Sequence, residues 1–225
     1  MIDPYIPALD TFSWSDDEEE AIRIALLHAD PWDHDASELR QVRTKLRQIK
    51  GRILEFHLAR QGHTCCYCRT NLNGGGHFLV DREHVLPKSR FKSLSYTISN
   101  LSVSCKRCNM QFKGNDLGFL RDCDTVEDKH DDSDQYLFAH PNFDSVDDLI
   151  ERVTVQISRK VAVAFRVSDH PKAQFTYTYF DLRGLEVSSF DHVQGSRKMD
   201  DLELEISKLL SIEVESIRHD DGESQ

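Results

Sequence analysis

The run CCYC at residues 65–68 and the run CKRCN at residues 105–109 decide how the centre of this chain folds. Each run carries two cysteines three positions apart, so that both sulfurs can coordinate the same side of a metal ion. Two such pairs complete a tetrahedral zinc site in which no ligand position stays open. We therefore predict a structural zinc bound by four thiolates, those of Cys65, Cys68, Cys105 and Cys108.

A closed zinc site cannot bind a substrate, so any chemistry has to come from the segment between the cysteine pairs. That segment contains the run DREHVLPKS at residues 81–89, in which Glu83 precedes His84. A carboxylate can hold a divalent cation, and a neutral imidazole can take a proton from water. The pattern predicts a strand over residues 78–86, which places Asp81 and Glu83 on one face and His84 on the other unless the strand twists.

Three further polar residues fit the same chemistry. Asn109 follows the last cysteine directly, and Lys113 comes four residues later. On a helix these two side chains share a face, where they offer a neutral oxygen ligand and an ammonium for a phosphate. Asn100 precedes a short apolar run, where a side-chain amide can pin a loop to the backbone.

Composition indicates the cellular compartment. The N-terminal residues lack the features of a signal peptide, and no apolar run approaches membrane-spanning length. We expect a cytoplasmic protein that does not enter a membrane, in which thiols stay reduced and paired cysteines bind metal. The two remaining cysteines, Cys66 and Cys123, are interpreted as ordinary thiols.

The charge of the chain is unevenly distributed. The formal net charge is −11, which has the wrong sign for a protein that coats nucleic acid indiscriminately. Basic residues nevertheless concentrate in residues 37–63, and acidic residues concentrate in residues 116–151. We interpret the two stretches as separate functional surfaces; solvated faces without a partner are the alternative.

The sequence of residues 1–63 predicts a helical N-terminal region. Ser15 and the acids after it predict a helix that runs to about Ala29, with Leu26 among its buried residues. Ser37 is expected to cap a longer helix, along which apolar residues from Leu39 to Phe56 recur at steps of three and four. We expect this stripe to pack on its own protein; a partner helix or a second subunit is the alternative.

The rest of the chain predicts an α+β fold with a zinc-stabilised core at residues 64–118. Residues 119–225 are interpreted as an acidic linker followed by a C-terminal α+β region. The linker composition extends over residues 116–134, and a short helix is expected at 145–152. Period-two alternation then predicts a meander of three strands, and a last helix follows at 199–211. The three strands are expected at residues 153–157, 161–167 and 175–179.

Taken in order, these motifs resemble those of the HNH, or ββα-metal, endonuclease family. The resemblance rests on four elements: Cys65-x-x-Cys68, Glu83-His84-x-x-Pro87-Lys88-Ser89, Asn100-Leu101, and Cys105-x-x-Cys108-Asn109-x-x-x-Lys113. It implies a zinc-bound ββα-metal core in which His84 is the general base and Asn100 braces its loop. It further implies that Glu83 and Asn109 hold a catalytic Mg²⁺ or Mn²⁺. The family often has His where this chain has Asn109, which is similar to the HNN variants and leaves the metal preference open.

The flanking segments resemble the HNH nucleases of Septu and retron-type antiphage defence systems. The likeness rests on the basic helical N-terminal region and on the run YLFAHP at residues 136–141. It implies an ABC-type ATPase as a partner protein. The acidic stretch or the C-terminal strands are the expected docking surfaces for that partner.

Three functions are consistent with the sequence. The leading hypothesis is a metal-dependent endonuclease that hydrolyses nucleic acid, with DNA as the expected substrate. Basic side chains near the motifs are expected to contact phosphates: Lys88, Arg90, Lys106, Arg107 and Lys113. The alternatives are an HNH effector that cleaves RNA or tRNA, and a non-catalytic zinc module that binds nucleic acid or protein.

Overall fold

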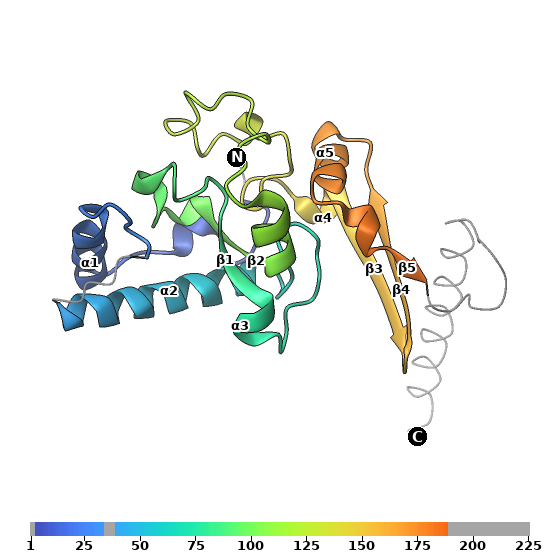
Figure 1. Ribbon diagram of the computed structural model, residues 1–225, viewed down its shortest axis with the longest axis horizontal. Coiled ribbons are helices and arrows are strands. Elements are labelled where there is room, and N and C mark those ends of the chain that lie inside the picture. Colours follow the sequence, from blue (N-terminus) through green and yellow to red (C-terminus); the bar gives the residue numbers. More distant parts are fainter. Residues whose placement is uncertain (1–2, 34–38, 189–225) are drawn as a thin grey trace, which may run out of the picture. The chain divides into compact units, whose positions relative to one another are not determined.

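The computed structural model describes residues 3–33 and 39–188 of the chain (Figure 1). The fold is α+β, as the sequence predicts, with one two-stranded and one three-stranded sheet. The chain divides into two compact units. The first contains residues 3–151 and Val167–Leu182, and the second contains Arg152–Arg166 and continues from Arg183. None of the helices in the described ranges is long and apolar enough to cross a membrane.

The first helix, α1 (Asp16–Leu26), begins where the sequence predicts. The backbone N–H of its N-cap, Ser15, donates to the Glu18 carboxylate at 3.0 Å, and four acids occupy the first turn, next to the positive end of the helix dipole. The helix ends three residues earlier than predicted. Leu26, expected to be buried, is 39% exposed because the buried face is formed by Ala21, Ile22 and Ala25.

The long helix α2 (Arg40–Arg60) packs on its own protein through the middle of its apolar stripe. Leu46, Ile49 and Ile53 are buried in one cluster with residues of α1. The first residue of the predicted stripe, Leu39, is 55% exposed and stands at the N-cap. The capping function predicted for Ser37 falls outside the described residues.

The centre of the first unit is a short antiparallel pair of strands, β1 (Val80–His84) and β2 (Leu101–Cys105). Their register pairs Val80 with Cys105 and His84 with Leu101, and Figure 1 shows them side by side. The prediction that the strand begins at residue 78 and runs to 86 is wrong at both ends. A helical turn, α3 (Gly76–Leu79), precedes β1, and the strand ends at His84 because the chain before Leu101 forms a short helix at Ile98–Asn100.

Short helical segments surround this pair of strands. The 3-10 helices η2 (Lys92–Leu94) and η3 (Ile98–Asn100) lie in the connection between the strands. After β2 the chain enters η4 (Arg107–Lys113), a π-helical segment. Local π geometry of this kind is frequent at functional sites. The remaining short helices are η1 (Leu9–Thr11), η5 (Ser133–Gln135), α4 (Val146–Leu149) and η6 (Leu182–Leu185).

The acidic stretch predicted as a linker contributes to the core of the first unit. Phe119, Val126, Tyr136 and Phe138 are fully buried, and the Phe119 ring stacks on Phe138 with a centroid distance of 4.4 Å. A few large apolar side chains therefore anchor this segment in the core of the first unit, although its average composition is polar.

The strand predicted at residues 175–179 is wrong, because these residues lie in helix α5 (Pro171–Tyr179). Pro171 occupies the first turn, where its fixed φ suits a helix, and the His170 side chain caps the start by accepting from the Lys172 N–H at 3.2 Å. The helix buries Ala173 and Thr176. The histidine cap and the proline at the start of α5 favour a helix more strongly than the alternating aromatic residues favour a strand.

Most of the hairpin that the sequence predicts, formed by β3 (Ile150–Ile157) and β4 (Lys160–Val167), belongs to the second unit. Ser158, in the turn between the two strands, has a positive φ. The third strand is β5 (Val187–Ser188), which pairs antiparallel with β4. The helix predicted at 199–211 lies outside the described residues.

Candidate active site

The four cysteines of the two paired motifs come together as predicted. Cys65, Cys68, Cys105 and Cys108 are all buried, and their sulfurs lie within 4.8 Å of one another. Within residues 3–33 and 39–188 they are the one group of three or more His, Cys, Asp or Glu side chains so arranged. The Arg69 N–H donates to the Cys65 carbonyl at 3.0 Å, which closes the first turn. This donor set can hold a metal ion such as zinc.

His84 ends strand β1 and is 7% exposed. Its Nε2 lies 3.1 Å from the carbonyl oxygen of Ser95, so Nε2 carries the proton in this contact and Nδ1 is left as the acceptor. The Trp32 ring packs edge-on against the imidazole at a centroid distance of 4.5 Å. Burial lowers the pKa of His84 to about 4, so the ring is a neutral base at neutral pH.

Asn100 holds the loop that follows His84. Its Oδ1 accepts from the Leu86 N–H at 2.7 Å, and its Nδ2 donates to the carbonyls of Leu86 and Leu94 at 3.2 and 3.3 Å. Its own carbonyl accepts from the Val85 N–H at 2.9 Å. A single buried amide therefore bonds to both sides of the connection between the two strands, which is what a loop-bracing residue does.

Glu83 is completely buried and faces away from solvent. Its Oε1 lies 2.9 Å from the Nζ of Lys113 and accepts a hydrogen bond from the Tyr67 hydroxyl at 3.1 Å. The Ser104 hydroxyl lies 3.5 Å from Oε2. Burial raises the pKa of Glu83, and the Lys113 ammonium and the Tyr67 hydroxyl oppose that rise. The carboxylate expected to hold a cation is thus engaged by side chains of both cysteine-bearing segments.

Asn109 contacts a different acid. Its Nδ2 donates to the Oδ2 of Asp81 at 2.9 Å. The sequence pattern placed Asp81 on the same face of the strand as Glu83 but assigned it no function. Strand alternation alone was the signal that could have singled it out.

A polar pocket of about 240 Å³ joins these residues. His84, Asp81 and Asn109 contribute to its wall, whereas Glu83 does not. Of the predicted phosphate ligands, Lys88 and Lys113 line it. The pocket also includes Trp32 and Asp33, and the Asp33 carboxylate forms an ion pair with Lys88.

Three predicted phosphate ligands lie outside the wall of this pocket. Arg90 is exposed, and Lys106 is half-buried. The Arg107 guanidinium is engaged within the first unit, where it donates to the carbonyls of Phe180 and Asp181 at 2.8 Å each. It also stacks over the Phe112 ring at 4.2 Å.

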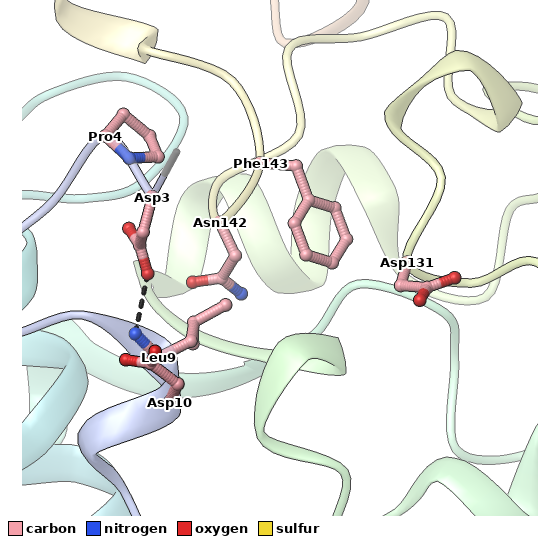
Figure 2. Close-up of a pocket in the computed structure, with 7 residues that line it drawn as sticks. All are labelled: Asp3, Pro4, Leu9, Asp10, Asp131, Asn142 and Phe143. Atoms are coloured by element: carbon pink, nitrogen blue, oxygen red, sulfur yellow. Dashed lines mark hydrogen bonds between the residues drawn. The ribbon is translucent and has the colours of Figure 1, made fainter. Parts of the chain in front are cut away.

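A larger pocket of about 400 Å³ lies elsewhere on the first unit (Figure 2). The close-up shows Asp3 accepting from the Leu9 N–H, and the Phe143 ring beside Asn142. No imidazole or ammonium lines this pocket, and Asp3 is paired with Arg60. Its lining residues are Asp3, Pro4, Leu9, Asp10, Asp131, Asn142 and Phe143. The smaller pocket beside His84 is therefore the candidate active site.

No protein-family model, curated protein or solved structure matches this chain.

Proposed function

We propose that this chain is a metal-dependent endonuclease of the HNH type, with DNA as its expected substrate. One observation carries the proposal: the neutral, oriented imidazole of His84 opens into a pocket that also holds Asp81, Asn109, Lys88 and Lys113. Acid, amide, base and ammonium groups in one small cavity match the needs of phosphodiester hydrolysis.

His84 acts as the general base. The Ser95 carbonyl holds the Nε2–H, which directs Nδ1 to a water molecule. Nδ1 takes the proton as the water oxygen bonds to phosphorus and the bond to the leaving oxygen breaks. Asn100 keeps the loop after His84 in place during this step. General-base catalysis contributes about 10²- to 10⁴-fold to such a reaction.

The cation is expected between β1 and η4. Carboxylate and amide oxygens suit Mg²⁺ and Mn²⁺, and such a cation stabilises the charge that develops on the leaving oxygen. The resemblance assigns Glu83 and Asn109 as its ligands. Asn109 lines the pocket, whereas Glu83 is buried and paired with Lys113. The zinc bound by the four cysteines is structural.

Phosphate binding begins with Lys88 and Lys113 in the pocket, and Arg90, Lys106 and the basic residues of α2 extend it. The formal charge of −11 predicts weak, salt-sensitive binding by the isolated chain. Weak binding by the isolated chain suits an enzyme that acts with a partner. We therefore also propose an ABC-type ATPase partner and an antiphage function, both of which the flanking motifs imply.

A digestion assay tests this function. Plasmid DNA and tRNA are incubated with the purified protein and Mg²⁺ or Mn²⁺, with His84→Ala as the test variant and His130→Ala, which changes a half-buried histidine outside the pocket wall, as the matched control. Wild type and His130→Ala should cleave the plasmid, and His84→Ala should lose about a hundredfold or more of the rate.

The other outcomes separate the alternatives. Cleavage of tRNA but not of plasmid would identify an RNA-directed effector. Binding of nucleic acid with no cleavage by wild type would indicate a non-catalytic zinc module. Equal cleavage by wild type and His84→Ala would overturn the proposed base.

A further inference from the structure

We propose that Asp81 is a ligand of the catalytic cation, together with Asn109. The inference rests on the proposed function and adds a residue to which the sequence motifs give no part. It begins with the hydrogen bond from Asn109 Nδ2 to Asp81 Oδ2 at 2.9 Å. Since the amide nitrogen is held by Asp81, the amide oxygen stays available for a cation. The contact thus places the Asp81 carboxylate next to the Asn109 carboxamide in the pocket wall.

Access to the pocket distinguishes Asp81 from Glu83. Asp81 and Asn109 both line the pocket of about 240 Å³ that contains His84. Glu83 is fully buried behind that wall. Mg²⁺ gives up its water reluctantly and usually keeps several water ligands, so its protein ligands have to face a solvated space. Asp81 meets that requirement.

The three acids near the pocket also differ in whether a lysine ammonium pairs with them. Glu83 is paired with Lys113, and Asp33, the other acid in the pocket wall, is paired with Lys88. The Asp81 carboxylate accepts from two uncharged donors, the Arg82 backbone N–H at 3.0 Å and the Asn109 amide at 2.9 Å. Neither donor is charged. The Arg82 guanidinium, which also lines the pocket, interacts electrostatically with Asp81 but donates its hydrogen bond to the Lys50 carbonyl at 2.6 Å, so Asp81 differs from Glu83 and Asp33, which form ion pairs with lysines.

The arrangement gives Glu83 a positioning function as well. Lys113 and Asn109 both belong to η4, so the Glu83–Lys113 pair fixes the segment that carries Asn109 against β1. Asp81 and Asn109 then meet the cation at the pocket surface, within the same cavity as the imidazole of His84.

Binding of Mn²⁺ to the zinc-loaded full chain, measured by calorimetry without nucleic acid, tests the assignment. Asp81→Asn should weaken the Mn²⁺ affinity by at least about tenfold, the scale reached when even an outer partner of a metal site is lost. Its zinc content and melting temperature should stay at the wild-type values, because Asp81 is only half-buried. Asp33→Asn, which also removes an acid from the pocket wall, should bind Mn²⁺ with nearly wild-type affinity.

Wild-type affinity in Asp81→Asn would overturn the proposal, as would a wild-type protein that binds no Mn²⁺. An equal loss in Asp81→Asn and Asp33→Asn would also overturn it, since the effect would then come from general pocket charge. Because the readout is binding, the result is independent of the digestion assay. If His84→Ala still cleaves DNA but Asp81→Asn loses Mn²⁺, the proposed base is wrong and the cation site stands.

Discussion

The Nζ of Lys113 lies 2.9 Å from the Oε1 of Glu83, and the two side chains are 2% and 0% exposed. An ion pair this deeply buried is costly to break from one side only, because the remaining charge has no partner and little water. It joins η4 to β1 directly behind the candidate active site.

Removing one partner of this pair should therefore destabilise the protein strongly. We expect Lys113→Met to lower the free energy of unfolding by about 3–5 kcal/mol, measured by urea denaturation. The double variant Lys113→Met/Glu83→Gln should recover much of that loss, because it leaves no buried charge. Losses that simply add in the double variant would show that the two groups are not coupled.

Loss of one cysteine ligand should release the zinc. Structural zinc contributes on the order of 10 kcal/mol of apparent folding free energy in small modules. We expect Cys65→Ser and Cys105→Ser to lower both the zinc-to-protein ratio and the melting temperature. Cys123→Ser, which changes an exposed thiol, serves as the control and should alter neither. A Cys65→Ser protein with full zinc content and unchanged melting would contradict the assigned site.

His57 should make the fold sensitive to acid. Burial, with a further contribution from Arg60, lowers its pKa from 6.5 to about 3. Below pH 6.5 the unfolded chain binds a proton that the folded chain excludes, so stability falls as the pH decreases towards 3. The slope from this one group approaches about 1.4 kcal/mol per pH unit.

Replacing the ring should remove that contribution. The loss of stability between pH 7.5 and pH 5, measured from urea midpoints, should be smaller in His57→Leu than in wild type. His130→Gln, which removes a half-buried histidine, serves as control. An unchanged difference between the two pH values in His57→Leu would show that other groups set the acid response.

Arg107 and Lys106 should behave differently although they are neighbours in the sequence. Arg107→Ala loses hydrogen bonds to the carbonyls of Phe180 and Asp181, which predicts a loss of about 1–3 kcal/mol in stability. Lys106→Ala should leave stability unchanged and reduce the salt slope of DNA binding by about 1. Denaturation and fluorescence anisotropy at several salt concentrations measure the two effects. The reverse pattern would make Arg107 the phosphate ligand.

Features set by local sequence were predictable. Cysteine spacing predicted the four-sulfur cluster, because each ligand pair lies within one turn and two such pairs complete a tetrahedral site. Alternation predicted the β3–β4 hairpin, because its two strands are neighbours in the chain. Local signals can also conflict. The aromatic residues from Phe175 to Tyr179 alternate like a strand, yet the cap at His170 and the proline after it start a helix.

Features set by contacts distant in the sequence were not predictable. The hydrogen bond from Tyr67 to Glu83 and the one from Asn109 to Asp81 depend on strand register and on where η4 lies, and spacing alone specifies neither. The burial of Phe119 in an acidic stretch depends in the same way on partners that come much later in the chain.

The stacking of Tyr67 on Phe180, with ring centroids 4.1 Å apart, has a consequence for the timing of biosynthesis. Tyr67 lies between Cys65 and Cys68, and the ring that covers it is translated 113 residues later, near the end of the unit. At about 5–20 residues per second, the ribosome delivers that ring on the order of ten seconds later. A nascent chain can thus expose its cysteine-bearing turn throughout that interval, when chaperones and the supply of zinc decide whether the four-cysteine site is filled.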